Sequence, residues 1–411
     1  MTLLRCAEIV LMIFSSQETL DAARFSPRYF TRIRKMSFQD ILCCLLSGCK
    51  GTAQAVLNNF FHRIRKTQHM TQQALSKARS HFDHTPFLKA FNALRDEEYN
   101  FEKEEKLKRL HGMLFIAIDG SIIPLPNFPE MRTEFGSLNG SPSARASIAL
   151  DVINDRIVDA SLSPLSIDER TLAKEHVEKI SKQISAKKIV FVFDRGYPSA
   201  ELISYLMSNS TNFIMRVKRK FSESVDKARI GSTLLTIEKG ITIRVIKFFL
   251  PSGEVETLIT NLFKVKEARF KELYFMRWPV ETKYDLVKNK LELPNFTGYS
   301  KNIIYQDFWI SMLLSNIASI ARAEADRNIG MRRSGRCKKY KYQANMNVVI
   351  ASLRDRFATA VFSKNPIIRR IRVNKIIYEI SCSAVPVRPN RDVSRSDPRK
   401  VKYHHNKKSN V

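Results

Sequence analysis

Hydrophobic and polar residues follow different spacings along the chain, and each spacing predicts a different kind of element. Near the start, apolar residues recur every three or four positions over residues 39–46, 53–64 and 87–94, which predicts amphipathic helices. The same spacing returns over residues 305–325 and 343–362, where we expect two long helices. Both ends of the chain are therefore predicted to be helical.

The middle of the chain carries short apolar runs instead, and two of them end in an aspartate. The run at residues 113–118 is followed by Asp119 and a glycine, and the run at residues 189–193 is followed by Asp194 in the sequence Asp-Arg-Gly-Tyr. Each run is typical of a buried strand that brings a carboxylate to a cleft. Between them, residues 146–162 predict a hairpin that turns at Asn154-Asp155.

These patterns predict an α/β protein built on a mixed sheet. Apolar and polar residues alternate between residues 219 and 262, which predicts a β-rich insertion before the last part of the core. The predicted regions are a helical N-terminal region (1–110), the first part of the core (111–218), the β-rich insertion (219–262), the second part of the core (263–326), and a basic helical C-terminal region with its tail (327–411).

Charge narrows the class of partner. The chain has 69 lysine and arginine residues against 40 aspartate and glutamate residues, which gives a formal charge of +29. This charge favours a polyanion as the binding partner, with nucleic acid the first candidate and an anionic membrane surface the second. The apolar run at residues 9–14 is far shorter than the roughly 20 residues of a membrane span, so we expect a cytoplasmic protein without membrane partners. The six cysteines show neither paired CxxC spacing nor a zinc pattern and are expected to be free thiols.

A short basic helix is predicted in the N-terminal region. Thr71 is a suitable cap for a helix whose side chains are of the types that contact bases and phosphates in a major groove: Gln72, Gln73, Ser76, Lys77 and Arg79. An ordinary polar amphipathic helix explains the same pattern. The basic, proline-bearing tail at residues 387–408 is predicted to be an extended phosphate-binding arm.

The segment 274–288 carries charged residues at an ordered spacing. On a helix, Tyr274, Arg277, Glu281 and Lys288 share one narrow stripe. A surface helix with an Arg277–Glu281 ion pair is the simpler interpretation. Pro279 lacks an amide hydrogen, so we expect the helix to kink or restart between Arg277 and Glu281.

Asp119, Asp194 and Glu281 are predicted to converge on one site. Carboxylates that lie close together raise one another's pKa, and a divalent cation removes this conflict. Oxygen ligands without histidine or cysteine favour Mg²⁺ or Mn²⁺ over zinc, and two such ions roughly 4 Å apart suit an in-line phosphoryl displacement. The sequence contains no glycine-rich phosphate loop or G-x-S-x-G elbow that indicates other chemistry.

The ordered set resembles the DDE transposases of the bacterial insertion-sequence-four family. The resemblance rests on Ala-Ile-Asp119-Gly-Ser, on Asp194-Arg-Gly-Tyr, and on Tyr274-(2)-Arg277-(3)-Glu281-(6)-Lys288. It implies a ribonuclease H-like fold, with the β-rich insertion preceding the last catalytic helix. It also implies that Asp119, Asp194 and Glu281 bind the metal ions.

The resemblance further implies what the protein binds and does. Tyr274, Arg277 and Lys288 would hold DNA phosphates, with Arg277 also orienting Glu281, and Arg195 in the second aspartate motif would contact DNA. The implied activity is cut-and-paste transposition, in which a homodimer in a synaptic complex cuts double-stranded DNA at terminal inverted repeats and joins the ends to target DNA. The implied location is the bacterial nucleoid.

Two other functions remain open from the sequence. One is an inactive or repurposed sequence-specific DNA-binding protein, and the other is a metal-dependent DNA nuclease that does not join ends. One departure concerns the insertion: family members that form a hairpin on flanking DNA use a tryptophan there, whereas this chain has tryptophan only at Trp278 and Trp309.

Overall fold

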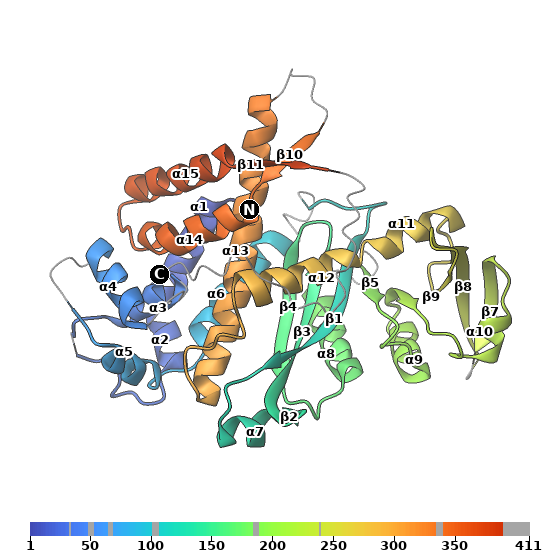
Figure 1. Ribbon diagram of the computed structural model, residues 1–411, viewed down its shortest axis with the longest axis horizontal. Helices are drawn as coiled ribbons and strands as arrows, with labels where there is room; N and C mark the ends of the chain where they lie inside the picture. The colour runs from blue at the N-terminus through green and yellow to red at the C-terminus, as the bar shows by residue number, and fades with distance from the viewer. Residues whose placement is uncertain are drawn as a thin grey trace, which may run out of the picture. The chain divides into compact units, whose positions relative to one another are not determined.

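A mixed sheet forms the centre of residues 95–301, and the α/β fold predicted from the sequence is confirmed. In the computed structural model, strands follow the order β2-β3-β1-β5-β6-β9-β8-β7, with β4 paired to β3 (Figure 1). The strands of this sheet are β1 (Leu114–Pro124), β2 (Ser137–Leu138), β3 (Ser141–Asp151), β4 (Arg156–Ser163), β5 (Ile189–Phe193), β6 (Asn212–Arg216), β7 (Gly231–Ile237), β8 (Ile241–Phe249) and β9 (Val255–Thr260).

Strand β1 lies between an antiparallel and a parallel neighbour. It pairs antiparallel with β3, so that Asp119 lies opposite Ile148. It pairs parallel with β5 only as far as Ile118 opposite Phe193, although β1 itself continues to Pro124. The predicted hairpin is confirmed as β3 and β4, and Asp155, the last residue of the loop that joins them, has a left-handed φ of 57°.

The predicted β-rich insertion extends this sheet. Strands β7, β8 and β9 form an antiparallel meander, and β9 pairs with β6, with Ile214 opposite Thr260. A short helix, α10 (Glu223–Lys227), precedes the meander. The return from β9 leads through a 3₁₀ turn (Glu267–Arg269) to the helices that carry the segment 274–288.

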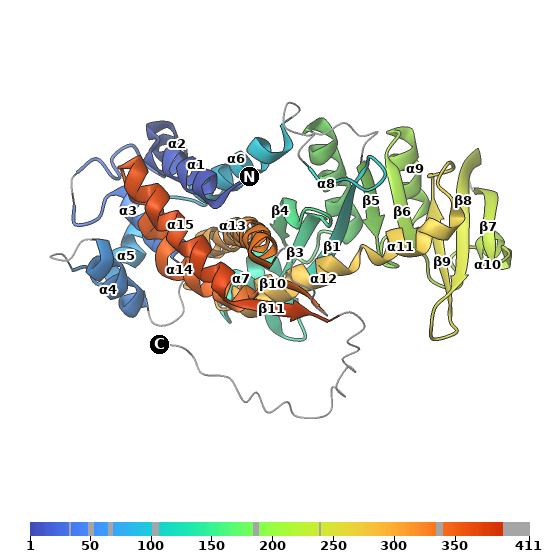
Figure 2. The same ribbon diagram turned by 90° about the horizontal axis from the view of Figure 1, so that it is seen from above.

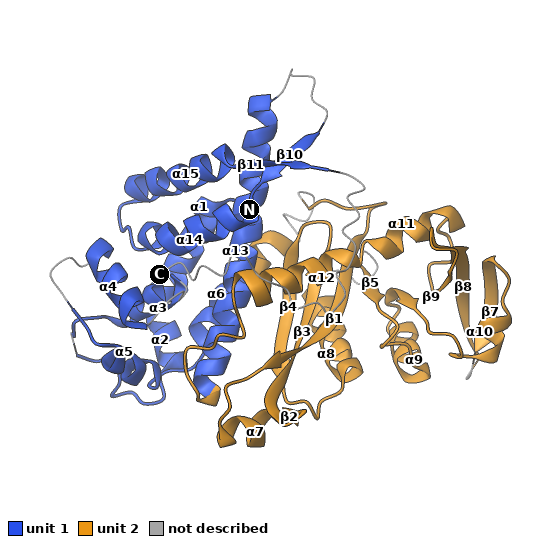
Figure 3. Ribbon diagram, viewed as in Figure 1, with its two compact units in different colours: residues 1–94, 302–411 blue, residues 95–301 orange. Residues whose placement is uncertain are grey.

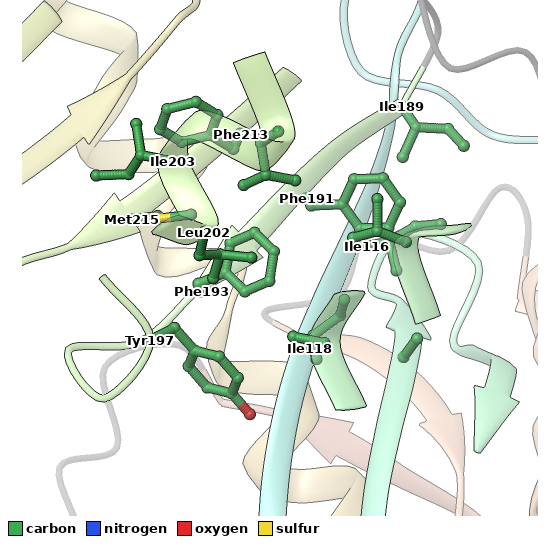
Figure 4. Close-up of a cluster of buried hydrophobic side chains, with 14 of the residues drawn as sticks. Ile116, Ile118, Ile189, Phe191, Phe193, Tyr197, Leu202, Ile203, Phe213 and Met215 are labelled. Atoms are coloured by element: carbon green, nitrogen blue, oxygen red, sulfur yellow. The ribbon is translucent and has the colours of Figure 1, made fainter. Parts of the chain in front are cut away.

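Helices cover the two faces of the sheet. One face carries α8 (Glu169–Gln183) and α9 (Ala200–Ser208), and the other carries α11 (Phe270–Phe275) and α12 (Trp278–Asp285), as Figure 2 shows. A further helix, α7 (Pro129–Phe135), follows β1. Ile116 and Ile118 of β1 and Phe191 and Phe193 of β5 join the hydrophobic core that includes residues of α8 and α9 (Figure 4).

The structure describes residues 1–32, 34–47, 53–64, 69–100, 107–183, 189–237, 240–333 and 340–388. They form two units, one made of residues 95–301 and the other of residues 1–94 and 302–411 (Figure 3). Apart from residues 387 and 388, the predicted phosphate-binding tail lies outside the described residues.

The unit made of both chain ends is largely helical. Its helices are α1 (Leu3–Ser15), α2 (Gln17–Ala23), α3 (Phe38–Leu46), α4 (Ala53–Ile64), α5 (Gln72–Arg79), α6 (Thr85–Tyr99, whose last turn belongs to the sheet unit), α13 (Lys301–Arg333), α14 (Met346–Val361) and α15 (Pro366–Cys382). Strands β10 (Lys341–Ala344) and β11 (Ala384–Val387) form a small ribbon beside them. Within the described part of the chain, no helix has the length and apolar character needed to cross a membrane.

Candidate active site

Asp119 and Asp194 lie next to each other on the face of the sheet that carries α12. Side chains alternate between faces along a strand, and Ile118 and Phe193 belong to the core on the opposite face, so the next residue on each strand faces away from that core. Ile118 and Phe193 are also register partners of the parallel pair β1 and β5. The two predicted aspartates therefore leave neighbouring strands on the same face.

The sequence indicated that Asp119 ends its strand, but in the structure the strand continues beyond it. Strand β1 continues through Pro124 because residues 120–124 pair with β3, for example Ile123 with Ala144. It is β5 that stops, after Phe193. The edge of β1 that faces β5 therefore loses its partner at Asp119, which places this residue at the end of the parallel pairing.

Glu281 is positioned by a helix that restarts beside Pro279. Helix α11 ends at Phe275, and α12 begins at Trp278 with the proline in its first turn, a position at which the missing amide hydrogen costs no helical hydrogen bond. The predicted break therefore falls around Arg277. Glu281 lies in the first turn of α12, and its side chain is 47% exposed.

Arg277 connects two of the three predicted carboxylates. Its guanidinium donates from Nη2 to Glu281 Oε1 at 2.9 Å, and its Nε lies 3.9 Å from Asp194 Oδ1. The arginine is 5% exposed. Burial alone would lower the pKa of Arg277, but Asp194 and the other neighbours raise it, so the side chain stays charged.

Asp119 lies in an environment that disfavours its charge. Its pKa is raised from 3.8 to about 6, mainly by burial and further by the nearby charge of Asp194. Arg277 and a hydrogen bond from the Gly120 amide, at 3.0 Å, act in the opposite direction. The carboxylate therefore lacks sufficient compensating positive charge from the protein itself. A cation bound beside Asp119 would supply that charge.

Asp194 also has unused binding capacity. Among the described residues, its buried Oδ1 has no hydrogen-bond partner, and the cations of Arg216 and Arg277 lie 3.9 Å from it. A buried oxygen without a donor keeps the capacity to accept a hydrogen bond or to bind a cation. No group of three or more Asp, Glu, His or Cys side chains within the described residues is arranged to hold a metal, and Glu281 is bonded to Arg277 instead.

The remaining residues of the predicted stripe differ in exposure, since Tyr274 is buried and Lys288 is partly exposed. Tyr274 is buried, at 5% exposure. Residues Leu286–Lys290 form a π-helical turn, a feature often found at functional sites. Lys288 of this turn contacts Ser121 Oγ and donates to the Ile122 carbonyl at 3.2 Å, both on β1. Burial lowers the pKa of Lys288, although Asp119 opposes the shift.

The predicted DNA-contacting residues differ in exposure. Arg195, directly after Asp194, is exposed. In the helical unit, Thr71 caps α5 as predicted by accepting a hydrogen bond from the Ala74 amide, and Gln72, Gln73 and Lys77 are exposed.

The prediction that Arg79 contacts DNA is not compatible with this conformation. The side chain is 4% exposed and donates to Gln306 at 3.0 Å and to Asp307 at 2.8 Å, both on α13. Its role is to bind α5 to α13. The sequence pattern could not reveal this, because the partners lie more than 200 positions further along the chain.

The sequence also did not single out Glu169. Its carboxylate lies on the α8 face of the sheet, where Arg145 Nη1 contacts Oε1 at 2.5 Å. A β-carbon on Gly120 would lie 3.0 Å from Glu169 Cδ, so the glycine that follows Asp119 leaves room for this ion pair. The signal in the sequence is slight: an acidic residue in the first turn of a predicted helix.

Sequence similarity relates the chain to known transposases. Residues 110–317, just over half of the chain, match the family model described as a transposase DDE domain. A probable transposase for insertion sequence element IS5377 from Geobacillus stearothermophilus is 23% identical over 158 residues, which cover 35% of this chain and 42% of that relative. The match thus spans less than half of the relative's length.

A solved structure shares the fold. The piggyBac transposase, in a synaptic complex with hairpin DNA, aligns with a TM-score of 0.52 over 90% of this chain and 85% of that chain, at 10% identity. This likeness confirms the mixed-sheet fold with helical regions at both ends of the chain. On the extent of the family match, the chain belongs to the transposase DDE domain family.

Proposed function

We propose that this protein is a DNA transposase of the insertion-sequence-four type that cuts phosphodiester bonds at the ends of a mobile element and joins the ends to target DNA. One observation carries the proposal. Two aspartates leave adjacent parallel strands on one face of the sheet, and Arg277 connects the second of them to Glu281 on the facing helix.

Membership of this family implies a divalent metal ion, and the donor set fits one. Asp119 and Asp194 offer hard oxygen atoms, the ligands that Mg²⁺ and Mn²⁺ prefer. The unpartnered Asp194 oxygen and the raised pKa of Asp119 both fit a site that can bind a cation. When bound, one or two such ions would stabilise the attacking and leaving oxygens of the phosphoryl displacement.

Glu281 would complete the ligand set from the helix side. Its carboxylate is held by Arg277 and is half exposed, so it can leave the arginine and turn towards the aspartates. In this proposal the hydrogen bond from Arg277 keeps the Glu281 side chain oriented in the protein without DNA. The arginine then neutralises Asp194 or a DNA phosphate beside it.

The proposed DNA contacts come from both units. Arg195 is exposed beside the aspartates and can reach a phosphate. Lys288 and Tyr274 would contribute after DNA displaces their present contacts. Gln72, Gln73 and Lys77 on α5 offer donors suited to base edges and phosphates in the helical unit. We further propose a homodimer as the synaptic assembly, because two element ends must be joined.

The test uses the purified full chain with Mg²⁺ or Mn²⁺ and linear DNA that carries the inverted repeats flanking the gene. We expect end cleavage followed by strand transfer, both lost in Asp194→Asn and Glu281→Gln. Asp285→Asn is the matched control, because Asp285 is an exposed carboxylate on the same helix, bonded to Asn289.

Each other outcome identifies a different function. Cleavage without joining would indicate a nuclease. Specific DNA binding without cleavage would indicate a repurposed DNA-binding protein. Activity that survives Asp194→Asn would disprove the assignment of that residue as a metal ligand.

A further inference from the structure

Tyr284 forms a direct hydrogen bond between the helix of Glu281 and the strand of Asp119. It lies on α12 three residues after Glu281, close to one helical turn, and is 8% exposed. Its hydroxyl donates to the main-chain carbonyl of Asp119 at 2.8 Å. The bond therefore ends on the backbone of one proposed metal ligand and starts within one turn of another.

The same hydroxyl lies close to a second strand. The carbonyl of Ala146 on β3 is 3.2 Å away, so one donor is shared between neighbouring strands. Asp119 lies opposite Ile148 of β3, and its carbonyl is on the side of β1 that faces β3, because the same hydroxyl reaches both Asp119 and Ala146. A tyrosine hydroxyl has a single hydrogen to donate, and no other part of that side chain can replace it.

The Asp119 carbonyl has a further neighbour on the opposite face of the sheet. Ser147 Oγ lies 3.5 Å from this carbonyl and 3.0 Å from His176 Nε2 on α8. His176 Nδ1 in turn lies 2.7 Å from Asp159 on β4. All three side chains of this chain of hydrogen bonds are buried. The backbone of Asp119 is thus contacted from both faces, and the stronger contact comes from Tyr284.

We propose that Tyr284 is a positioning residue that sets the separation of Asp119 and Glu281 through its hydroxyl group. This inference rests on the proposed metal-binding roles of those two carboxylates. Tyr284 itself touches no reacting atom in this arrangement. A displacement of about 1 Å in a catalytic group can lower a rate roughly 100-fold, so the loss of one hydrogen bond at this place is expected to affect catalysis.

Tyr284→Phe removes the hydroxyl and keeps the ring. Tyr99→Phe is the matched control, because Tyr99 is also a buried tyrosine of the sheet unit, and its hydroxyl donates to Asp151 Oδ2 at 2.8 Å at the end of β3. Both substitutions delete one buried hydrogen bond. Only the first deletes a bond to the Asp119 backbone.

Three measurements on the full chain separate positioning from general stability. They are the thermal midpoint, the affinity for element-end DNA without divalent metal, and the single-turnover rate of end cleavage. We expect both variants to lose a similar amount of thermal stability and to bind DNA within about twofold of wild type. Tyr284→Phe should cleave about tenfold more slowly, whereas Tyr99→Phe should stay within about twofold.

Equilibrium Mn²⁺ binding, measured by calorimetry, gives a readout that needs no turnover. Tyr284→Phe should weaken Mn²⁺ binding several-fold and Tyr99→Phe should not. Wild-type rate and Mn²⁺ affinity in Tyr284→Phe, or equal losses in both variants, would overturn the inference. If the wild-type protein neither binds Mn²⁺ nor cuts DNA, the proposed function itself is wrong. This outcome differs from the ones above, in which the wild type is active and only the role of Tyr284 is disproved.

A second variant covers the case in which Tyr284→Phe does not fold. Ser147→Ala removes the contact with the same carbonyl from the α8 face. We expect a smaller loss of cleavage rate, of about threefold, with unchanged affinity for DNA. An unchanged rate in a folded Ser147→Ala protein would also contradict the inference.

Discussion

Arg277 determines how two of the three carboxylates are placed. Its Nη2 bonds Glu281 while its Nε faces Asp194, so a single planar group contacts both. A guanidinium can do this because it presents several donors in a fixed geometry, whereas an ammonium group is a compact point charge. The sequence predicted the first contact from the four-residue spacing, but not the second, which requires the fold.

Arg277→Lys should therefore impair activity more than stability. The charge remains, so we expect a loss of about 1–2 kcal/mol in the free energy of unfolding, but one ammonium cannot contact both carboxylates. End cleavage should fall at least about tenfold. Denaturant unfolding and a cleavage assay measure the two effects.

Arg216→Lys is the control for this prediction. Arg216 also lies 3.9 Å from Asp194, but its main partner is Glu256, at 2.7 Å. Arg216→Lys should therefore reduce the cleavage rate less than Arg277→Lys does. Equal losses in the two variants would show that any cation near Asp194 suffices.

The pKa of Asp119 predicts how the stability of the metal-free protein depends on pH. Burial raises this pKa from 3.8 to about 6, so the folded state binds the proton more tightly than the unfolded state. The resulting stabilisation is present below pH 3.8 and is lost as the pH rises through about 6. The loss amounts to at most about 3 kcal/mol.

Asp119→Asn cannot ionise and isolates this contribution. In denaturant unfolding without metal, the variant should gain stability relative to wild type as the pH rises from about 4 to 7. Adding Mg²⁺ or Mn²⁺ should stabilise wild type at neutral pH and should reduce the difference. A difference of constant size across this range would show that Asp119 is not strained by its burial.

At the scale of elements, strand β1 packs closely against helix α8 at Gly120. The added β-carbon of Gly120→Ala would meet Glu169, which is restrained by its ion pair with Arg145. We expect a cost of about 1–2 kcal/mol in the free energy of unfolding. In the Glu169→Ala background the same substitution should cost clearly less, and denaturant unfolding of the four proteins measures this coupling.

Gly196→Ala serves as the control for this packing. Its β-carbon would lie 4.0 Å from Glu169 Oε2, an ordinary contact distance, so the cost should be small. A cost for Gly120→Ala that does not change when Glu169 is removed would mean that the strain comes from the backbone.

The sequence predicts elements well where the pattern is local. Strand β5 was predicted with its observed bounds, because an apolar run bounded by Lys188 and Asp194 leaves little choice. The end of β1 was predicted too early, because residues 120–124 are held by pairing with β3 and not by their own hydrophobicity. Helix α12 restarts where Pro279 predicts it.

The site was predictable only in part, for the same physical reason. The two aspartates follow apolar runs and can be recognised locally. Glu169 and Tyr284 act through strand register and helix packing, which no spacing in the sequence records. Arg79 has donor groups suited to DNA, yet Asp307 neutralises it from another part of the chain.

At the scale of the whole molecule, the charge of +29 predicts how DNA binding responds to salt. A protein that neutralises several phosphates releases the counterions bound to them, so the logarithm of its affinity falls linearly with the logarithm of salt concentration. With six to ten phosphate contacts, the affinity should fall about 10³- to 10⁵-fold between 50 and 200 mM salt. Fluorescence anisotropy with labelled element-end DNA measures the slope.

Variants of the exposed cations test which residues produce that slope. Lys77→Gln and Arg195→Gln should each reduce its magnitude by about one unit if the side chain contacts a phosphate. Arg79→Gln should instead lower the free energy of unfolding, because that side chain pairs with Asp307 inside the protein. A slope that stays near zero would mean that the basic residues do not serve DNA binding.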